Sequence, residues 1–190
     1  MIDGEDILTL CGIDEAGRGP LAGPLVMAGV ILADRVEGLT DSKKLSQKGR
    51  EALYPQIIDA SRHHIVIFTN REIDDEGISA CLHSGLEDIK RFFGEVEYLF
   101  DGNSTFGVDG ISTMVKADLK VEEVSAASIL AKVTRDRMMN DYAKIYPSYG
   151  FEKHKGYGTA THIAMMREHG RCTIHRQSFR VKALDELTLF

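Results

Sequence analysis

The sequence contains no tryptophan, little cysteine and no long hydrophobic run. Its three cysteines, Cys11, Cys81 and Cys172, cannot all pair and form no CxxC, so structural disulfides are not expected. The longest apolar stretch, residues 21–33, is interrupted by glycine and proline and falls short of the roughly 20 residues that cross a bilayer. The N-terminus is acidic where an export signal would be basic. We therefore expect a cytoplasmic protein with no membrane segment.

Two common site motifs are also incomplete. His169, Cys172 and His175 supply three candidate zinc ligands, but no CxxC pair completes a tetrahedral set. The glycines within residues 17–23 do not have GxGxxG spacing, and GxxxxGK[ST] is absent from the chain. Acidic side chains directly before those glycines would repel a pyrophosphate. The sequence thus argues against a zinc site and a dinucleotide site.

What is present is an ordinary globular composition with segregated charge. Hydrophobic residues make up 43% of the 190 residues and charged residues 27%, and the formal net charge is −6, values typical of a self-sufficient folded domain. Residues 132–182 carry a net charge of +7, whereas residues 1–131 carry −11. The basic segment is either a solvated helical face or a surface that binds phosphates.

Apolar periodicity predicts short strands that alternate with helices. The expected strands cover residues 8–13, 25–32, 64–68, 96–100 and 112–115. The expected helices cover residues 47–58, 73–93, 121–146, 160–168 and 181–187, with a loop at 147–158. This order predicts an α/β fold, a mixed central sheet flanked by helices with a small helical C-terminal section. We expect a core in residues 1–158 and a helical extension, residues 159–190, packed on it.

Carboxylates follow the apolar segments at three places. Asp14 and Glu15 come at the end of the first expected strand, Asp101 ends the fourth, and Asp118 lies between the fifth strand and the long helix. An isolated Asp-Glu pair is commonly a solvated turn, but ligands of α/β sheets gather beyond strand ends, where such acids meet. Buried neighbouring carboxylates need a cation, and oxygen ligands suit Mg²⁺ or Mn²⁺.

Asp136 competes with Asp118 for the fourth place in this acidic set. It lies in the middle of the long expected helix, between Arg135 and Arg137. We expect it to form a surface ion pair there, which contributes little stability. The position of Asp118 at a strand end favours Asp118.

Five segments, taken in chain order, resemble the signature segments of the ribonuclease HII family. They are DEAGRG at 14–19, DSKKL at 41–45, AASILAKV at 126–133, HKGYGT at 154–159 and HRQSF at 175–179. The resemblance implies a ribonuclease H-like fold. It also implies an endonuclease that hydrolyses the RNA strand of RNA-DNA hybrids and cuts 5′ of single ribonucleotides in duplex DNA, leaving 5′-phosphate and 3′-hydroxyl ends. The family role would be the removal of misincorporated ribonucleotides.

The resemblance assigns the acids their role. Asp14, Glu15, Asp101 and Asp118 match the four active-site carboxylates of the family, and they would hold two Mg²⁺ or Mn²⁺ ions when substrate is bound, with Asp14 as the bridge. Paired cations neutralise the phosphodiester, activate a water and stabilise the leaving oxygen. This chemistry requires no catalytic histidine.

The resemblance also implies how a ribonucleotide is recognised. The 2′-hydroxyl distinguishes it from DNA, and Gly17, Arg18 and Gly19 would contact it through their backbone. Tyr157 would bond the hydroxyl and pack on the adjoining sugar, since it offers a flat ring with a polar tip between two glycines. Without the resemblance, Tyr157 would be interpreted as a half-exposed packing residue.

Further side chains are candidates for phosphate contacts that fix register without reading sequence. They are Lys43, Lys44, Ser128, Lys132, Lys155, Arg176 and Arg180. Ser128 and Lys132 share one helical face. For each lysine, simple solvation is the alternative. The expected partner is an RNA-DNA hybrid or a duplex that contains a ribonucleotide, bound by a monomer.

The C-terminal residues Glu186, Leu187, Thr188, Leu189 and Phe190 are similar to the peptides that dock bacterial replication proteins on the sliding clamp, except that Glu replaces the leading Gln. An apolar tail folded back on the body is the alternative. Two other functions also stay open: a nonenzymatic nucleic-acid-binding module, and a resolvase-like nuclease of the same fold. The filled acidic positions disfavour the first, and Tyr157 disfavours the second.

Overall fold

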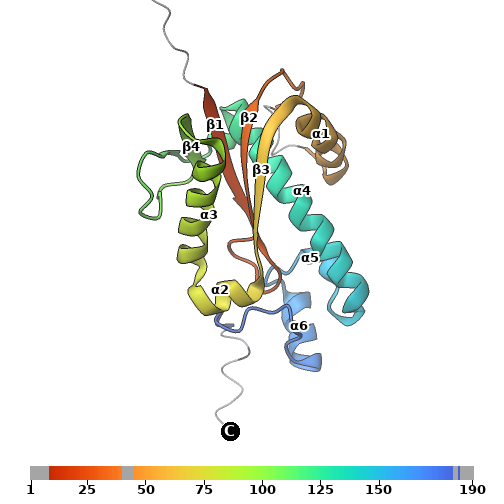
Figure 1. Ribbon diagram of the computed structural model, residues 1–190. Helices are drawn as coiled ribbons and strands as arrows, with labels where there is room; N and C mark the ends of the chain where they lie inside the picture. Colours follow the sequence, from red (N-terminus) through yellow and green to blue (C-terminus); the bar gives the residue numbers. More distant parts are fainter. Residues whose placement is uncertain (1–8, 40–44, 182–183, 185–190) are drawn as a thin grey trace, which may run out of the picture.

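The computed structural model describes residues 9–39, 45–181 and 184, and these residues form one five-stranded sheet flanked by helices (Figure 1). The strands are β1 (Leu10–Ala16), β2 (Leu25–Leu32), β3 (Ser61–Phe68), β4 (Glu97–Asp101) and β5 (Ser112–Met114). Their order is β3-β2-β1-β4-β5; β2 runs antiparallel to both β1 and β3, and β4 runs parallel to both β1 and β5. The predicted mixed sheet is therefore confirmed.

Two strand boundaries differ from the prediction in ways that matter. β1 continues past residue 13 to Ala16 because Asp14, Glu15 and Ala16 pair with β2. The two acids thus belong to the strand itself and do not follow it. β3 begins at Ser61, before the expected start at 64, because its polar first residues pair with the end of β2.

The helices are α1 (Gln47–Ala60), α2 (Asn70–Glu76), α3 (Ile78–Phe93), α4 (Glu122–Ile145), α5 (Phe151–His154) and α6 (Ala160–His169). Two 3₁₀ turns, η2 (Ala117–Leu119) and η3 (Pro147–Tyr149), complete the described elements. No helix of the described ranges has the length and apolar character to cross a bilayer.

The single helix predicted over 73–93 is wrong. The Thr69 side chain accepts a hydrogen bond from the Glu72 N–H, and Glu72 caps Thr69 in return, so α2 begins at Asn70. Gly77, at φ 89°, then separates α2 from α3. The loop predicted over 147–158 contains η3 and α5, and the helix predicted over 181–187 lies mostly outside the described residues.

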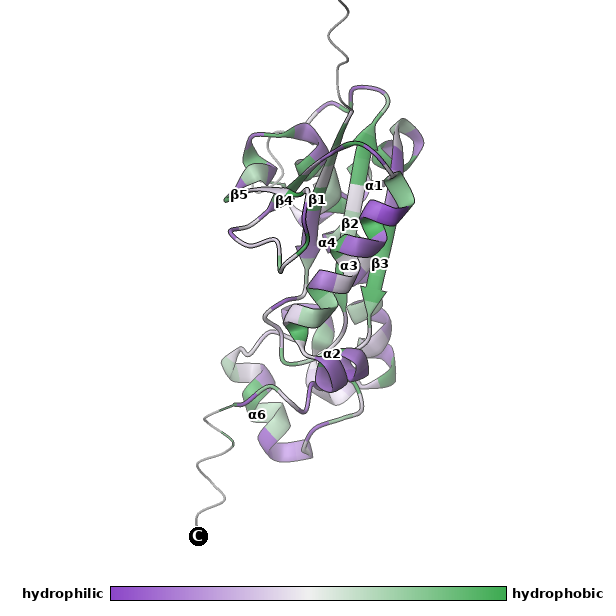
Figure 2. Ribbon diagram, turned by 60° about the vertical axis from the view of Figure 1, so that its left-hand side comes forward, coloured by the Kyte–Doolittle hydropathy of each residue, from purple (hydrophilic) through white to green (hydrophobic). Residues whose placement is uncertain are grey.

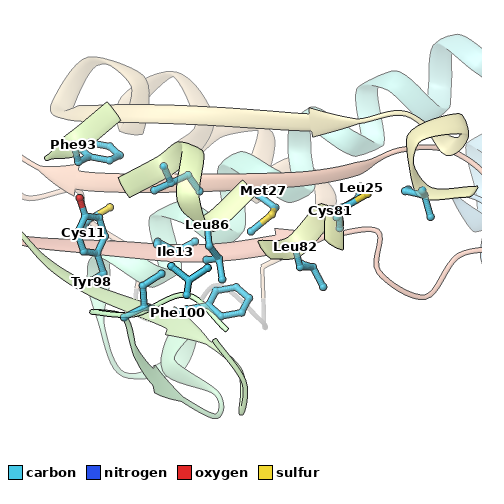
Figure 3. Close-up of a cluster of buried hydrophobic side chains, with 14 residues drawn as sticks. Cys11, Ile13, Leu25, Met27, Cys81, Leu82, Leu86, Phe93, Tyr98 and Phe100 are labelled. Carbon is cyan, nitrogen blue, oxygen red and sulfur yellow. The ribbon is translucent and has the colours of Figure 1, made fainter. Parts of the chain in front are cut away.

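Alternation along β1 sends its side chains into two layers. Cys11 and Ile13 join the apolar core under α3, together with Leu86 and Phe100 (Figure 3). Asp14 faces the other layer, where α4 contributes the hydrogen-bonding hydroxyl of Ser128. In Figure 2 the central strands are largely hydrophobic, whereas α2 is hydrophilic. Both faces of the sheet carry an apolar core, under α3 on one side and under α4 on the other, and Asp14 interrupts the α4 side at the end of β1.

A satellite core joins the C-terminal section to the rest of the chain. Buried Met166 of α6 and Ile174 pack with Met139 of α4, Phe151 of α5 and Ala22. The division into residues 1–158 and 159–190 stays a prediction.

Candidate active site

The sheet register brings the acidic residues of separate strands together. Ile13 of β1 lies opposite Phe100 of β4 in a parallel pair, which places Asp14 beside Asp101 at the strand ends. The Asp101 carboxylate accepts hydrogen bonds from the N–H groups of Lys116 (2.8 Å) and Ala117 (3.3 Å). Asp101 therefore fixes the turn into η2, which presents Asp118 to the same site.

Burial and mutual repulsion make ionisation of these acids unfavourable. Burial raises the pKa of Asp14 well above its usual range, and the charges of Glu15 and Asp101 raise it further, against a hydrogen bond from Ser128. Burial raises the pKa of Glu15 to about 7, although Arg18 opposes the shift. The pKa of Asp101 is also raised, by burial and by its contact with Asp118. The site favours a compensating positive charge.

The donor set fits hard divalent cations. The Oε2 atom of Glu15 is buried and has no hydrogen-bond partner among the described residues, and every acidic ligand candidate offers oxygen. Asp14 contacts Glu15, and Asp101 contacts Asp118. In the described part of the chain, no group of three or more His, Cys, Asp or Glu side chains is arranged to hold a metal ion.

A pocket of about 380 Å³ opens at this end of the sheet. Its lining joins acids, glycines, cations and an aromatic ring: Glu15, Ala16, Gly17, Arg18, Gly19, Arg50, Asp118, Ser128, Ile129, Lys132 and Tyr157. Tyr157 is 45% exposed. Most of the residues predicted to bind substrate therefore surround the acids.

The two glycines of the loop after β1 occupy different environments. A Cβ at Gly17, where φ is 99°, would lie 2.2 Å from Nε of Arg135 and 2.5 Å from the Pro24 carbonyl oxygen. A Cβ at Gly19 would meet no atom of the described residues within 4 Å. The fold thus explains glycine at 17, whereas the open backbone at Gly19 faces only the pocket.

The structure corrects the expectation for Asp136. Its side chain is only 6% exposed and forms an ion pair with Lys132 at 2.6 Å, so the predicted surface pair is wrong. The mid-helix position of Asp136 gave no sign that this side of α4 faces inward. Asp118, not Asp136, lines the pocket.

Two predicted phosphate contacts are also corrected. The Lys155 ammonium is held by Asn140 and the Glu152 carbonyl oxygen, and the residue is 8% exposed. Arg176 is fully buried, and its guanidinium donates to backbone carbonyls. Neither charged group reaches the surface, because protein acceptors hold each one inside. Arg180 is exposed outside the pocket lining, and Lys43 and Lys44 lie outside the described residues.

Sequence reasoning missed three residues around the pocket. Arg50 of α1 lines it directly. Phe106 stacks under the guanidinium of Arg18, with 5.1 Å between Cζ and the ring centre. Arg135 is buried beneath the loop that starts at Gly17. Arg50 follows the DSKKL segment by one helical turn, which is the one signal available for any of them.

The fold and the acidic pocket define a class, the ribonuclease H-like hydrolases. A family model described as Ribonuclease HII matches residues 11–182. Over 181 residues the chain is 66% identical to the ribonuclease HII of Sulfurovum sp. strain NBC37-1, covering 95% of this chain and 96% of that protein.

Two solved structures are similar as well. One is the RNase HII of Archaeoglobus fulgidus in a complex with PCNA, with 29% identity, a TM-score of 0.77 and coverage of 94% of this chain and 100% of that chain. The other is the ribonuclease H2 of Pyrococcus horikoshii OT3, with 27% identity, a TM-score of 0.71 and coverage of 91% and 94%.

The chain belongs to the ribonuclease HII family. It is a type 2 ribonuclease H, a hydrolase that acts on the RNA strand of RNA-DNA hybrids. The predictions of the family and of the ribonuclease H-like fold are confirmed.

Proposed function

We propose that this enzyme cuts duplex DNA on the 5′ side of a single embedded ribonucleotide, as well as longer RNA tracts, through two bound Mg²⁺ or Mn²⁺ ions. The observation that carries the proposal is the pocket itself. Glu15, whose buried Oε2 has no hydrogen-bond partner within the described ranges, lines the same cavity as Asp118, Gly19 and Tyr157. Cation ligands and groups suited to a sugar are therefore adjacent.

Asp14, Glu15, Asp101 and Asp118 would hold the cations. Bound there, they supply neutralisation of the phosphodiester, a lowered pKa of the attacking water and stabilisation of the leaving oxygen. The Ser128 hydroxyl lies beside Asp14 and favours its charged form. Hydrolysis by water leaves a 5′-phosphate and a 3′-hydroxyl.

The other pocket residues would select the ribonucleotide. Tyr157 has an exposed ring for the sugar and a hydroxyl for the 2′-oxygen. Gly19 leaves space for the backbone of the substrate to approach. Lys132 lies at the rim, 32% exposed, and is suited to a phosphate even while paired with Asp136.

The test uses two duplexes that differ by one oxygen atom. A labelled duplex with one ribonucleotide and the matching all-DNA duplex are incubated with the protein in Mg²⁺, in Mn²⁺ and in EDTA. We expect cutting of the first duplex only, 5′ of the ribonucleotide, and only with metal. Cutting of the all-DNA duplex would favour the resolvase-like alternative, and binding without cutting would favour a nonenzymatic module.

We also propose the replication sliding clamp as a partner. The similar Archaeoglobus fulgidus structure is a complex with PCNA, and residues 186–190 resemble clamp-binding peptides, although they lie outside the described residues. Deleting those five residues should weaken binding to an immobilised bacterial clamp while cleavage of a free duplex is unchanged. Equal clamp binding by the truncated protein would reject the proposal.

A further inference from the structure

Arg176 holds the glycine loop after β1 from below. Its guanidinium is fully buried and donates to the carbonyl oxygens of Gly17 (2.6 Å), Arg18 (3.1 Å) and Gly23 (3.0 and 3.1 Å). Its own N–H donates to the Leu21 carbonyl at 2.9 Å. One buried side chain thus satisfies three carbonyls of the loop that lines the pocket.

These bonds set the direction of two successive peptide groups. In a trans peptide the C=O and the N–H point in opposite directions, and the described residues contain no cis peptide. Since the carbonyls of Gly17 and Arg18 point down to Arg176, the N–H groups of Arg18 and Gly19 point away from it, on the side of the pocket. Neither N–H has a hydrogen-bond partner within residues 9–39, 45–181 and 184.

A second buried guanidinium supports the same loop. Arg135 donates from Nε to the Pro24 carbonyl (2.9 Å) and from Nη2 to the Ala22 carbonyl (3.1 Å), and its Nη1 has no partner among the described residues. Its Cζ lies 5.8 Å from the ring centre of Tyr157. Within the described part of the chain, neither Arg135 nor Arg176 forms an ion pair with a carboxylate. Two buried positive charges, with Asp74 and Asp136 acting on them only from beyond ion-pair distance, therefore lie under the loop, and the N–H groups of Arg18 and Gly19 in that loop have no partner among the described residues.

We propose that Arg176 is a positioning residue, which orients the N–H groups of Arg18 and Gly19 as a paired donor for the sugar-phosphate oxygens of the substrate, with Arg135 adding positive potential. This inference rests on the proposed function. Successive N–H groups that point the same way form an anion-binding concavity, and charge behind them strengthens it. The planar fork of arginine reaches three carbonyls at once, whereas lysine directs its donors from a single nitrogen.

The first test compares Arg176→Lys with a matched control, Arg171→Lys. The Arg171 guanidinium also donates to carbonyls, those of Arg176 and Phe179 at 2.7 and 2.9 Å, but it does not touch the loop of residues 17–24. On the duplex with one ribonucleotide, we expect Arg176→Lys to raise KM by about tenfold, the size of one or two lost hydrogen bonds, while Arg171→Lys leaves KM within about twofold. The thermal shift produced by Mn²⁺ should be the same in both variants.

A KM of Arg176→Lys that stays at the wild-type value, or that rises equally in Arg171→Lys, overturns the inference in favour of a structural role alone. The second test needs no variant. In ¹⁵N-labelled wild-type protein with EDTA, the backbone N–H signals of Arg18 and Gly19 should shift when the duplex with one ribonucleotide is added. Unchanged signals for both groups also overturn the inference. If the wild-type protein fails to cut that duplex with metal, the proposed function itself is rejected.

Discussion

The loop of residues 17–24 separates a buried cluster of acidic side chains from a buried cluster of arginines. The two clusters are stabilised differently. Before the loop, Asp14 and Glu15 are buried with raised pKa values, and one Glu15 oxygen has no partner among the described residues. Beneath it, Arg135 and Arg176 are buried and form no direct ion pair within the described residues, and carbonyl oxygens accept hydrogen bonds from them. Carbonyl oxygens accept from most of the arginine donors, although Nη1 of Arg135 has no partner among the described residues. The acids, in contrast, are buried beside one another and raise one another's pKa values, so the acidic cluster is the one that a bound cation would stabilise.

The largest expected effect comes from removing one charge of the acidic cluster. Asp14→Asn should lower the rate of cleavage by a factor of about 10³ or more, as loss of a transition-state charge contact does. The same change should raise the melting temperature of the metal-free protein at pH 8, because it removes a repulsive buried charge. Cleavage and thermal unfolding are measured on the same sample. A variant that is both inactive and less stable would show that Asp14 supports the fold.

The second prediction contrasts the two loop glycines. Gly17→Ala should destabilise the fold by about 2–4 kcal/mol, since its Cβ collides with Arg135 at a positive φ. Gly19→Ala should leave the free energy of unfolding within about 0.5 kcal/mol of the wild-type value. The variant should, however, lose affinity for the duplex. Urea unfolding and KM separate the two effects. Equal destabilisation by both changes would contradict the difference between the two positions.

The pH dependence of stability sharpens the same comparison. The folded protein binds the Glu15 proton more tightly than the unfolded chain, with a pKa of about 7 against 4.5. The protonated Glu15 side chain therefore makes its full contribution to the free energy of unfolding below pH 4.5, and this contribution is lost as the pH rises through 7. The loss is at most about 3 kcal/mol. The melting temperature of the metal-free protein should fall over this range, less so in Glu15→Gln, and added Mg²⁺ should restore more stability at pH 8 than at pH 5.5.

The smallest expected effect concerns the hydroxyl of Tyr157. Tyr157→Phe keeps the ring above Arg135 but removes one hydrogen bond to substrate, so we expect cleavage at a single ribonucleotide to fall by about tenfold. Stability should be unchanged, because the residue is 45% exposed. Cleavage rates and melting temperatures for both proteins test this. Wild-type activity in the variant would indicate that the ring alone is needed.

An acidic site was expected from the sequence because Asp14, Glu15 and Asp101 stand at the ends of apolar segments, and Asp118 comes shortly after a fifth expected strand; the role of these acids stays a prediction. The sequence did not predict the break at Gly77, because apolar residues keep helical spacing from Ile73 through Leu82. The sequence also did not predict that the charged residues Asp136, Lys155 and Arg176 are buried. The Gly17 carbonyl that accepts from Arg176 and the Asn140 side chain that accepts from Lys155 are brought near only by tertiary packing. The donor to Asp136 is Lys132, one turn away on α4, but side-chain type alone indicates exposure for all of these charged residues.

The most direct test of the account locates the bound cation without measuring activity. Paramagnetic Mn²⁺ is titrated into ¹⁵N-labelled protein, and the broadening of each backbone signal is recorded. We expect early loss of the signals of Glu15, Ala16, Asp101 and Asp118, while those of α6 persist. Broadening centred on another acidic surface, such as Asp88 of α3, would contradict it.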